Sequence, residues 1–323
     1  MKGDCQTHAG TANDQMEVSL PVMPQWSKYA GEVVDVSSRR SIVRVSSGTG
    51  ETAIVDYFLH AGTFYRAVIP MEGVKSVCGQ IFNFSEKRTR VTPSGREVIY
   101  DRRGLPKRKI PFAFHVQTRF SMKPEHPIRL YELGTNPEGE ALHQVGEWVY
   151  TVEANGPVGW QFSLSNGLSG NLLSVHRFLS MEEMVFERIV VGNQWVTESP
   201  GLPLNEAQKR ELLRRSIDRS HRAGMSERYF AFRVCGTNNC TSNPFKILDE
   251  VLVYRGWHRL GAMFFRLPIA PRLYLRMRGL DSDPDSFKLV RDEYQKFVEQ
   301  SETQQRKRKY VRALIKRRRE VAQ

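Results

Sequence analysis

The order in which strand-like and helix-like segments follow one another is the strongest constraint on the fold. Between residues 28 and 70 the chain has four short apolar runs, "GEVVDVS", "SIVRVSS", "TAIVDYFL" and "TFYRAVIP", separated by Gly- and Ser-rich turns. Such runs of β-branched and aromatic residues are typical of antiparallel strands. Further strands are predicted at 110–120, 127–134 and 146–154. The proline-containing connection "SMKPEHP" between the first two predicts a turn.

The second half of the chain has helical spacing instead. Asn205 is a favourable N-cap for a helix that Gly224 ends. A strand at 228–236 follows, and Pro244 then opens an apolar helix, because proline is tolerated in a first helical turn. Residues from 285 onward are predicted to form one long charged helix. Strands followed by helices indicate an α+β protein.

Changes in composition divide the chain into four parts. Residues 1–25 are polar and lack periodicity, so we expect them to be disordered. Residues 26–77 are predicted to form a small antiparallel β unit, and residues 78–298 the main domain. Residues 299–323 form a basic helical tail.

Positive charge is concentrated in that tail. The net charge is +13, and residues 301–323 hold nine Lys or Arg against two Glu, which gives +7 and leaves +6 for the rest. Such a run is either a solvated helix or a contact for polyanions such as nucleic acid or an anionic surface. The residues expected to make that contact are Arg306, Lys307, Arg308, Lys309, Lys316, Arg317, Arg318 and Arg319.

The sequence offers no sign of a membrane span or a metal site. No stretch approaches the ~20 apolar residues of a span, and the first 25 residues lack the apolar core of a Sec signal. We therefore expect a cytoplasmic protein, although a chain exported by another route, or one that had lost its leader, would look the same. Cys5, Cys78, Cys235 and Cys240 show no zinc-binding spacing. No metal or organic cofactor is predicted.

Cys240 is the candidate nucleophile. It precedes Pro244, so it should lie at a helix start, where unpaired N–H groups and the helix dipole favour a thiolate. The alternative is a buried structural cysteine, which the polar surround "NNCTSN" makes less favourable. Cys235 lies in an apolar strand and is expected to be structural.

His115 is the candidate general base. It lies in the middle of the strand "FAFHVQTRF", and strand alternation puts Gln117 and Arg119 on its face. If strands 110–120 and 127–134 form a hairpin, Glu132 falls opposite His115 and could orient its ring. The alternative is that His115 is an ordinary hydrogen-bonded sheet residue.

The ordered series "HVQTRF", "GLSGN", "LPLNEAQKRELL", "NNCTSN" and "LPIAPRLYLRMRGL" resembles the Lnb N-terminal periplasmic domain family. That family is a permuted NlpC-type branch of the papain-like cysteine hydrolases. The similarity covers roughly residues 78–298. It implies an α+β papain-like domain with Cys240 as nucleophile, His115 as base and Glu132 as orienting group, while Asn239 helps to shape the oxyanion site.

Two departures from the family are visible. Its members usually carry an export segment, which is not seen here, and Pro244 replaces the usual small or apolar residue. The resemblance implies a hydrolase or acyltransferase acting on an amide or ester bond. The alternative function is a protein that binds nucleic acid or an anionic surface through residues 85–109 and the tail. A degenerate papain-like domain that serves only for interaction is a third possibility.

Overall fold

The structure is a computed structural model. It describes residues 20–46, 50–93, 95–102, 104–111, 113–160, 164–232, 237–264, 269–281 and 287–301. Most of the predicted disordered N-terminus, most of the basic tail, and Cys235 lie outside these described residues.

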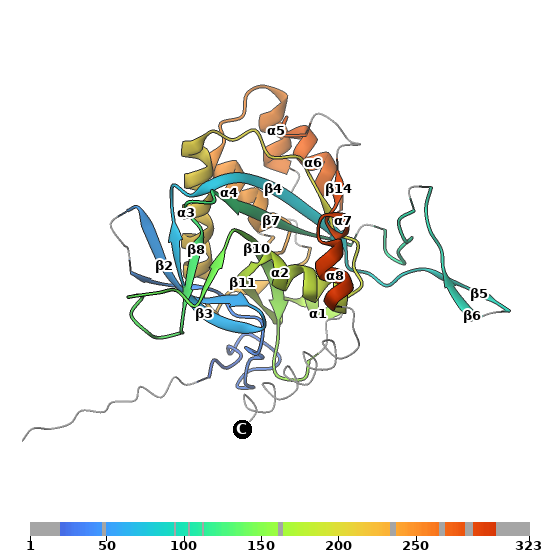
Figure 1. Cartoon of the computed structure of the whole chain (residues 1–323). Coiled ribbons are helices and arrows are strands. Elements are labelled where there is room, and N and C mark those ends of the chain that lie inside the picture. Colours follow the sequence, from blue (N-terminus) through green and yellow to red (C-terminus); the bar gives the residue numbers. More distant parts are fainter. Residues whose placement is uncertain are drawn as a thin grey trace, which may run out of the picture.

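One large sheet organises the chain (Figure 1). Its strand order is β14-β12-β4-β7-β10-β11-β2-β3-β8-β9, with β1 beside β2 and β13 beside β11. The pairing of β11 with β2 is parallel, which makes the sheet mixed. The α+β class is confirmed. The strands are β1 (Val43–Ser46), β2 (Thr52–His60), β3 (Thr63–Pro70), β4 (Val74–Asn83), β7 (Phe114–Met122), β8 (Ile128–Tyr131), β9 (His143–Val145), β10 (Glu147–Asn155), β11 (Leu172–Ser180), β12 (Thr197–Glu198), β13 (Arg228–Tyr229) and β14 (Lys288–Leu289).

Strands β2, β3, β7, β8 and β10 fall where the sequence predicts strands. The first predicted run, residues 31–37, instead makes only isolated bridges at Val33 and Val34. The strands of the predicted 26–77 unit belong to the same sheet as β7 and β10. The predicted boundary between residues 77 and 78 lies inside β4.

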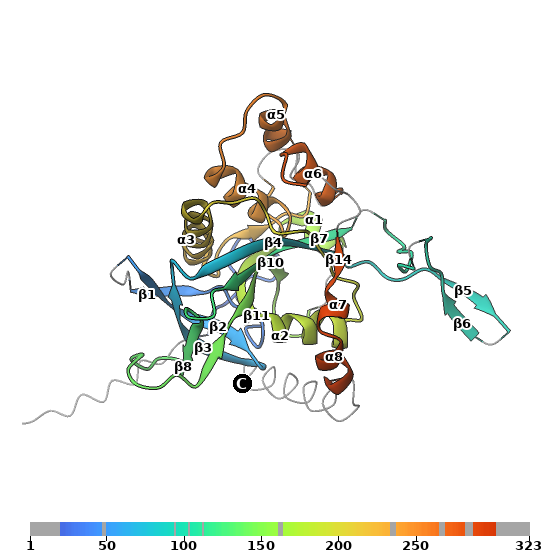
Figure 2. The same ribbon diagram turned by 45° about the horizontal axis from the view of Figure 1, so that its top comes forward.

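Helices cover both faces of this sheet (Figure 2). The longest helix of the described residues, α3, has a complete capping box in which the Asn205 side chain accepts from the Gln208 amide and the Gln208 side chain accepts from the Asn205 amide. The box supplies acceptors for the backbone N–H groups of Asn205 and Gln208, which have no acceptor within the helix. The predicted start of this helix at Asn205 is therefore confirmed. The helices are α1 (Leu164–Ser169), α2 (Met181–Met184), η1 (Val185–Val191), α3 (Glu206–Ala223), α4 (Ser242–Val251), α5 (Trp257–Phe264), α6 (Pro271–Met277), α7 (Val290–Glu293) and α8 (Gln295–Ser301).

The single long helix predicted from residue 285 is wrong in the part that the structure describes. Strand β14 comes first there, and two short helices, α7 and α8, follow. Lys288 and Leu289 pair with β12, and Val290 and Val298 are buried against η1. Burial of these two valines and pairing of β14 with β12 therefore outweigh the local helix propensity of the segment.

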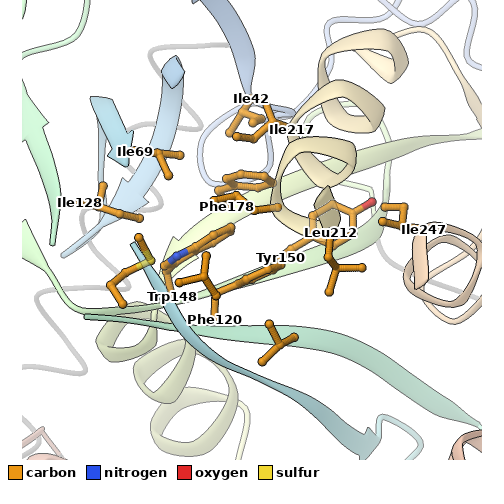
Figure 3. Close-up of a cluster of buried hydrophobic side chains, with 14 of the residues drawn as sticks. Ile42, Ile69, Phe120, Ile128, Trp148, Tyr150, Phe178, Leu212, Ile217 and Ile247 are labelled. Carbon is orange, nitrogen blue, oxygen red and sulfur yellow. The ribbon is translucent and has the colours of Figure 1, made fainter. Parts of the chain in front are cut away.

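The main core lies between the sheet and the pair α3 and α4 (Figure 3). At its centre the Trp148 ring lies between Phe120 and Phe178, with centroids 4.5 and 4.6 Å away. All three side chains are fully buried. A second core on the opposite face packs β10 and β11 against α2, η1, α7 and α8. Strand alternation sends neighbouring residues of β7 and β10 to these two different cores.

A basic excursion leaves the body between β4 and β7. It contains a separate hairpin of β5 (Thr89–Thr92) and β6 (Gly95–Val98), which projects away from the sheet in both views (Figures 1 and 2). The surface excursion expected at 85–109 is therefore confirmed. We call residues 85–109 the basic segment.

Candidate functional site

A local turn built by Asn239 places Cys240 next to Thr241, the N-cap residue of α4. The Asn239 Oδ1 accepts hydrogen bonds from the Thr241 and Ser242 amides at 2.9 and 2.7 Å. In return, the Ser242 hydroxyl accepts from the Asn239 amide at 2.9 Å. The Asn239 side-chain nitrogen donates to the Ala231 carbonyl at 2.7 Å. The Asn239 side chain is therefore fully engaged, with its oxygen at the start of α4 and its nitrogen on the Ala231 carbonyl.

The Cys240 thiol is enclosed. Its side chain is buried, and its sulfur contacts the Phe114 carbonyl at 3.7 Å and the Tyr229 hydroxyl at 3.8 Å. Burial raises the pKa of the thiol, and the hydrogen bonds from Tyr229 and the Val116 amide offset this only in part. The sequence predicts a lowered pKa at this helix start. The direction is the opposite, because loss of hydration outweighs the helix terminus here.

His115 is also buried and is held by its neighbours. Its Nε2 shares a 2.7 Å hydrogen bond with the Thr151 hydroxyl, and its ring stacks on Phe82 with centroids 4.8 Å apart. Burial, followed by the positive charge of Arg188, lowers the pKa of His115 to about 3. The imidazole is therefore neutral at physiological pH.

The backbone brings Cys240 and His115 close together, but their side chains serve different faces of the sheet. The Cys240 sulfur hydrogen-bonds the backbone at Phe114 and Val116, the two residues that flank His115. The Val116 side chain packs in the core beside α4. Strand alternation therefore directs the His115 ring to the other face, where Phe82 lies. Among the described residues no hydrogen bond joins the thiol to the imidazole.

The hairpin that supported Glu132 is wrong. Strand β7 pairs with β4 and β10, while β8 pairs with β3 and β9. Both edges of β7 are occupied, so β8 has no free edge of β7 to join. On the β4 side the residue opposite His115 is Phe82. Glu132 follows β8 and is exposed, so the structure does not bring it to His115.

Two residues near His115 were missed from the sequence, Thr151 and Glu153 of β10. Thr151 pairs with Gln117, and continuing that register by two residues puts Glu153 opposite His115. The two polar residues alternate in "TVEA", as His115 and Gln117 do in β7. Because alternation of this kind places residues on one face, it was the available signal.

Glu153 anchors a buried ion cluster behind His115. Its carboxylate pairs with Arg39 at 2.9 Å, with Arg177 at 2.7 Å and with Arg188. Burial alone would raise the pKa of Glu153, but these three guanidinium groups hold it well below its usual range. We assign this carboxylate a structural role first, because removal of either partner would leave a buried charge uncompensated.

A basic cavity of about 580 Å³ adjoins this region. It lies among the basic segment, the ends of β4 and β7, and the start of α6. Five cationic side chains line it, against the one described carboxylate of Asp101. The cationic residues are Arg88, Lys107, Arg108, Lys109 and Arg272, and the larger apolar ones are Phe82, Phe114, Trp195, Ile269 and Leu273.

The cations of the basic segment are crowded. Burial lowers the pKa of Arg108, whose guanidinium donates to the Ser85 carbonyl at 3.0 Å. Burial, followed by the charge of Arg108, lowers the pKa of Lys87. Within the described chain Arg88 and Lys107 are exposed and form no ion pair. The cavity therefore has an excess of positive charge that an anion would relieve.

No known protein family, curated protein or solved structure matches this chain. In the described residues no cluster of three or more His, Cys, Asp or Glu side chains could hold a metal ion. The described helices also include none that is long and apolar enough to cross a membrane.

Proposed function

We propose that the chain binds a phosphorylated organic molecule in the basic cavity. The observation that carries the proposal is the lining of that cavity, in which five cations and one described carboxylate stand beside aromatic and aliphatic walls. This develops the anion-binding alternative for the basic segment. It replaces an extended polyanion with a small ligand.

The charge of the cavity selects a ligand with more than one negative charge. Five cations and Asp101 line the cavity, and since Lys109 already pairs with Glu86, an excess of about three positive charges remains. A phosphate group brings about −1.5 to −2 at neutral pH and three acceptor oxygens. Arginine guanidinium groups match its geometry by bidentate hydrogen bonds, and its higher charge distinguishes it from a monocarboxylate.

The apolar walls select a ligand with a ring or chain attached to its phosphate. Phe114 and Trp195 line the cavity and are only partly covered. Aromatic side chains of this kind stack on flat ligand groups. The volume of about 580 Å³ lies within the range of about 300–1,000 Å³ that is typical of small-molecule sites.

The test is calorimetric titration with phenyl phosphate, inorganic phosphate and phenol. Phenyl phosphate should bind most tightly, because it alone uses both the charges and the apolar walls. The double variant Arg88→Glu/Lys107→Glu should weaken its binding at least tenfold. The matched control, Lys75→Glu/Arg129→Glu, makes the same change in net charge at exposed sites outside the cavity. Equal losses in the two variants, or no binding of phenyl phosphate, would refute the proposal.

A second candidate function is the cysteine-dependent hydrolase or acyltransferase, together with its papain-like fold. Its support is that Phe114 has two contacts: its carbonyl accepts from the Cys240 thiol, and the residue also lines the basic cavity. Cys240 does not itself line the cavity, so Phe114 would separate a ligand there from the thiol. We propose His115 as the base, with Glu153 and Thr151 behind it in place of Glu132.

In this second proposal the Cys240 sulfur attacks the carbonyl carbon of an amide or ester. The thiol proton passes to the imidazole, which returns it to the leaving amine or alcohol, and water or an acceptor then releases the acyl group. The buried thiol must first be uncovered, and the imidazole must reach it from the other face of the sheet and regain hydration, because burial lowers the pKa of His115 to about 3. Attack therefore requires a local opening around Phe114.

Acyl transfer to the protein separates the two candidates. Treatment with p-nitrophenyl acetate followed by peptide mass spectrometry should find the acetyl group on Cys240 if the chain is a hydrolase, and His115→Ala should abolish that product. Cys240→Ala should retain phenyl phosphate binding in either case. Acetylation confined to lysines would eliminate the hydrolase and leave the binding proposal standing.

A further inference from the structure

Helix α5 presents an exposed apolar face. Val253, just before the helix, is 90% exposed, and Trp257 and Leu260 are 83% and 43% exposed. The spacing of three residues places Trp257 and Leu260 on one side of α5, and Val253 lies in the connection that leads into the helix. Both ribbon views put α5 at the end of the molecule that is remote from the sheet (Figures 1 and 2).

This face is exposed because the opposite side of α5 is the side that packs. Gly261 lies so close to α6 that a Cβ there would be 2.7 Å from the Met277 carbonyl oxygen. Ala262 is buried, and the His258 ring nitrogen is 3.0 Å from the same carbonyl oxygen. The close approach fixes the rotation of α5 about its axis. The packing of α5 on α6 therefore leaves the Trp257 indole exposed to solvent.

The exposed charges that flank this face are basic, whereas Arg278 farther along the chain is buried against Asp249. Arg255 and Arg259 flank Trp257 and are both exposed. The sequence from 251 to 280 contains six arginines and no acidic residue. An exposed tryptophan with aliphatic neighbours and flanking arginines is the composition of a segment that lies at the surface of an anionic bilayer.

We propose that α5 docks on an anionic lipid bilayer, with Trp257, Leu260 and Val253 entering the headgroup region and Arg255 and Arg259 contacting lipid phosphates. Eight residues of helix span only about 12 Å, so α5 would lie in the interface without crossing it. A second copy of the chain is a poor occupant, because it would bring the same arginines face to face. This inference is independent of the cavity and of Cys240.

The experiment measures partition of the whole chain onto two kinds of large vesicle. One contains phosphatidylcholine alone, and the other also contains about 30 mole per cent phosphatidylglycerol, which gives the surface a negative potential. Binding should require the anionic lipid. Arg255→Gln/Arg259→Gln should weaken it about 25-fold, since each basic residue near such a surface contributes ~1 kcal/mol. The matched control, Lys75→Gln/Arg129→Gln, should change it less than threefold.

Insertion of the indole is measured separately by tryptophan fluorescence. The emission of the wild type should shift to the blue on anionic vesicles, and Trp257→Phe should abolish most of that shift. Leu142→Ser, at another exposed apolar residue, is the control and should leave partition unchanged. The proposal is overturned if the chain binds neutral and anionic vesicles equally, or if Trp257→Phe keeps the full shift. It is also overturned if Arg255→Gln/Arg259→Gln and the control Lys75→Gln/Arg129→Gln lose binding equally. A dimer in solution that Trp257→Ser dissociates would instead assign the face to self-association.

Discussion

Replacement of His115 tests the environment assigned to the polar face of β7. The pKa of His115 is lowered from 6.5 to about 3 by burial and by Arg188. Between these values the unfolded chain binds a proton that the folded chain does not, so the free energy of unfolding falls as the pH falls. From pH 6.5 to 4.5 this costs two pH units, or about 2.7 kcal/mol at ~1.36 kcal/mol per unit.

The assay is urea unfolding of the wild type and His115→Gln at pH 7.0 and pH 4.5. Glutamine can still hydrogen-bond Thr151 but does not titrate. The variant should be less stable than the wild type at pH 7.0 and should gain about 2.5 kcal/mol relative to it at pH 4.5. His126→Gln is the control, because that side chain is exposed in the folded protein. If the difference in free energy of unfolding between wild type and His115→Gln is the same at pH 7.0 and pH 4.5, the His115 imidazole is not buried in the neutral form.

Three further predictions follow from the packing. Cys240 and Cys78 should react slowly with iodoacetamide at pH 7, because burial raises the pKa of both thiols, and the rate should rise sharply in urea; fast native labelling of Cys240 would contradict its enclosure. Glu153→Gln should lower the free energy of unfolding by about 3–5 kcal/mol, since it leaves buried guanidinium groups unpaired; a loss below ~1 kcal/mol in urea titrations would show the cluster to be solvated. Trp148→Ala should cost about 3–5 kcal/mol, and a smaller calorimetric change would mean that the core collapses around the cavity.

Local patterns predicted the elements that depend on nearby residues. The capping box at Asn205 fixes the start of α3, and the turn before Pro244 fixes α4. The alternation in β7 correctly marked a polar face. These features could be predicted because helix ends and strand faces are set by residues within a few positions of one another.

Long-range pairing could not be predicted in the same way. Glu132 was placed opposite His115 because the strands are neighbours in sequence, but β4 and β10 occupy both edges of β7. The predicted lowering of the thiol pKa was wrong for a related reason: "NNCTSN" is polar in sequence, but residues 239–243 are buried and the Asn239 oxygen accepts the amides at the helix start. The basic cavity joins residues 88–111 to residues 269–273, a contact that no local pattern encodes.

The central claim is that the basic cavity holds a phosphorylated ring compound, and the most direct measurement locates such a compound. Crystals grown with 4-bromophenyl phosphate should show the bromine anomalous signal beside Phe114 and Trp195, with the phosphate within hydrogen-bond distance of the arginines that line the cavity. Bromine signal only at other surfaces, or no signal at a concentration that saturates binding in solution, would contradict the claim.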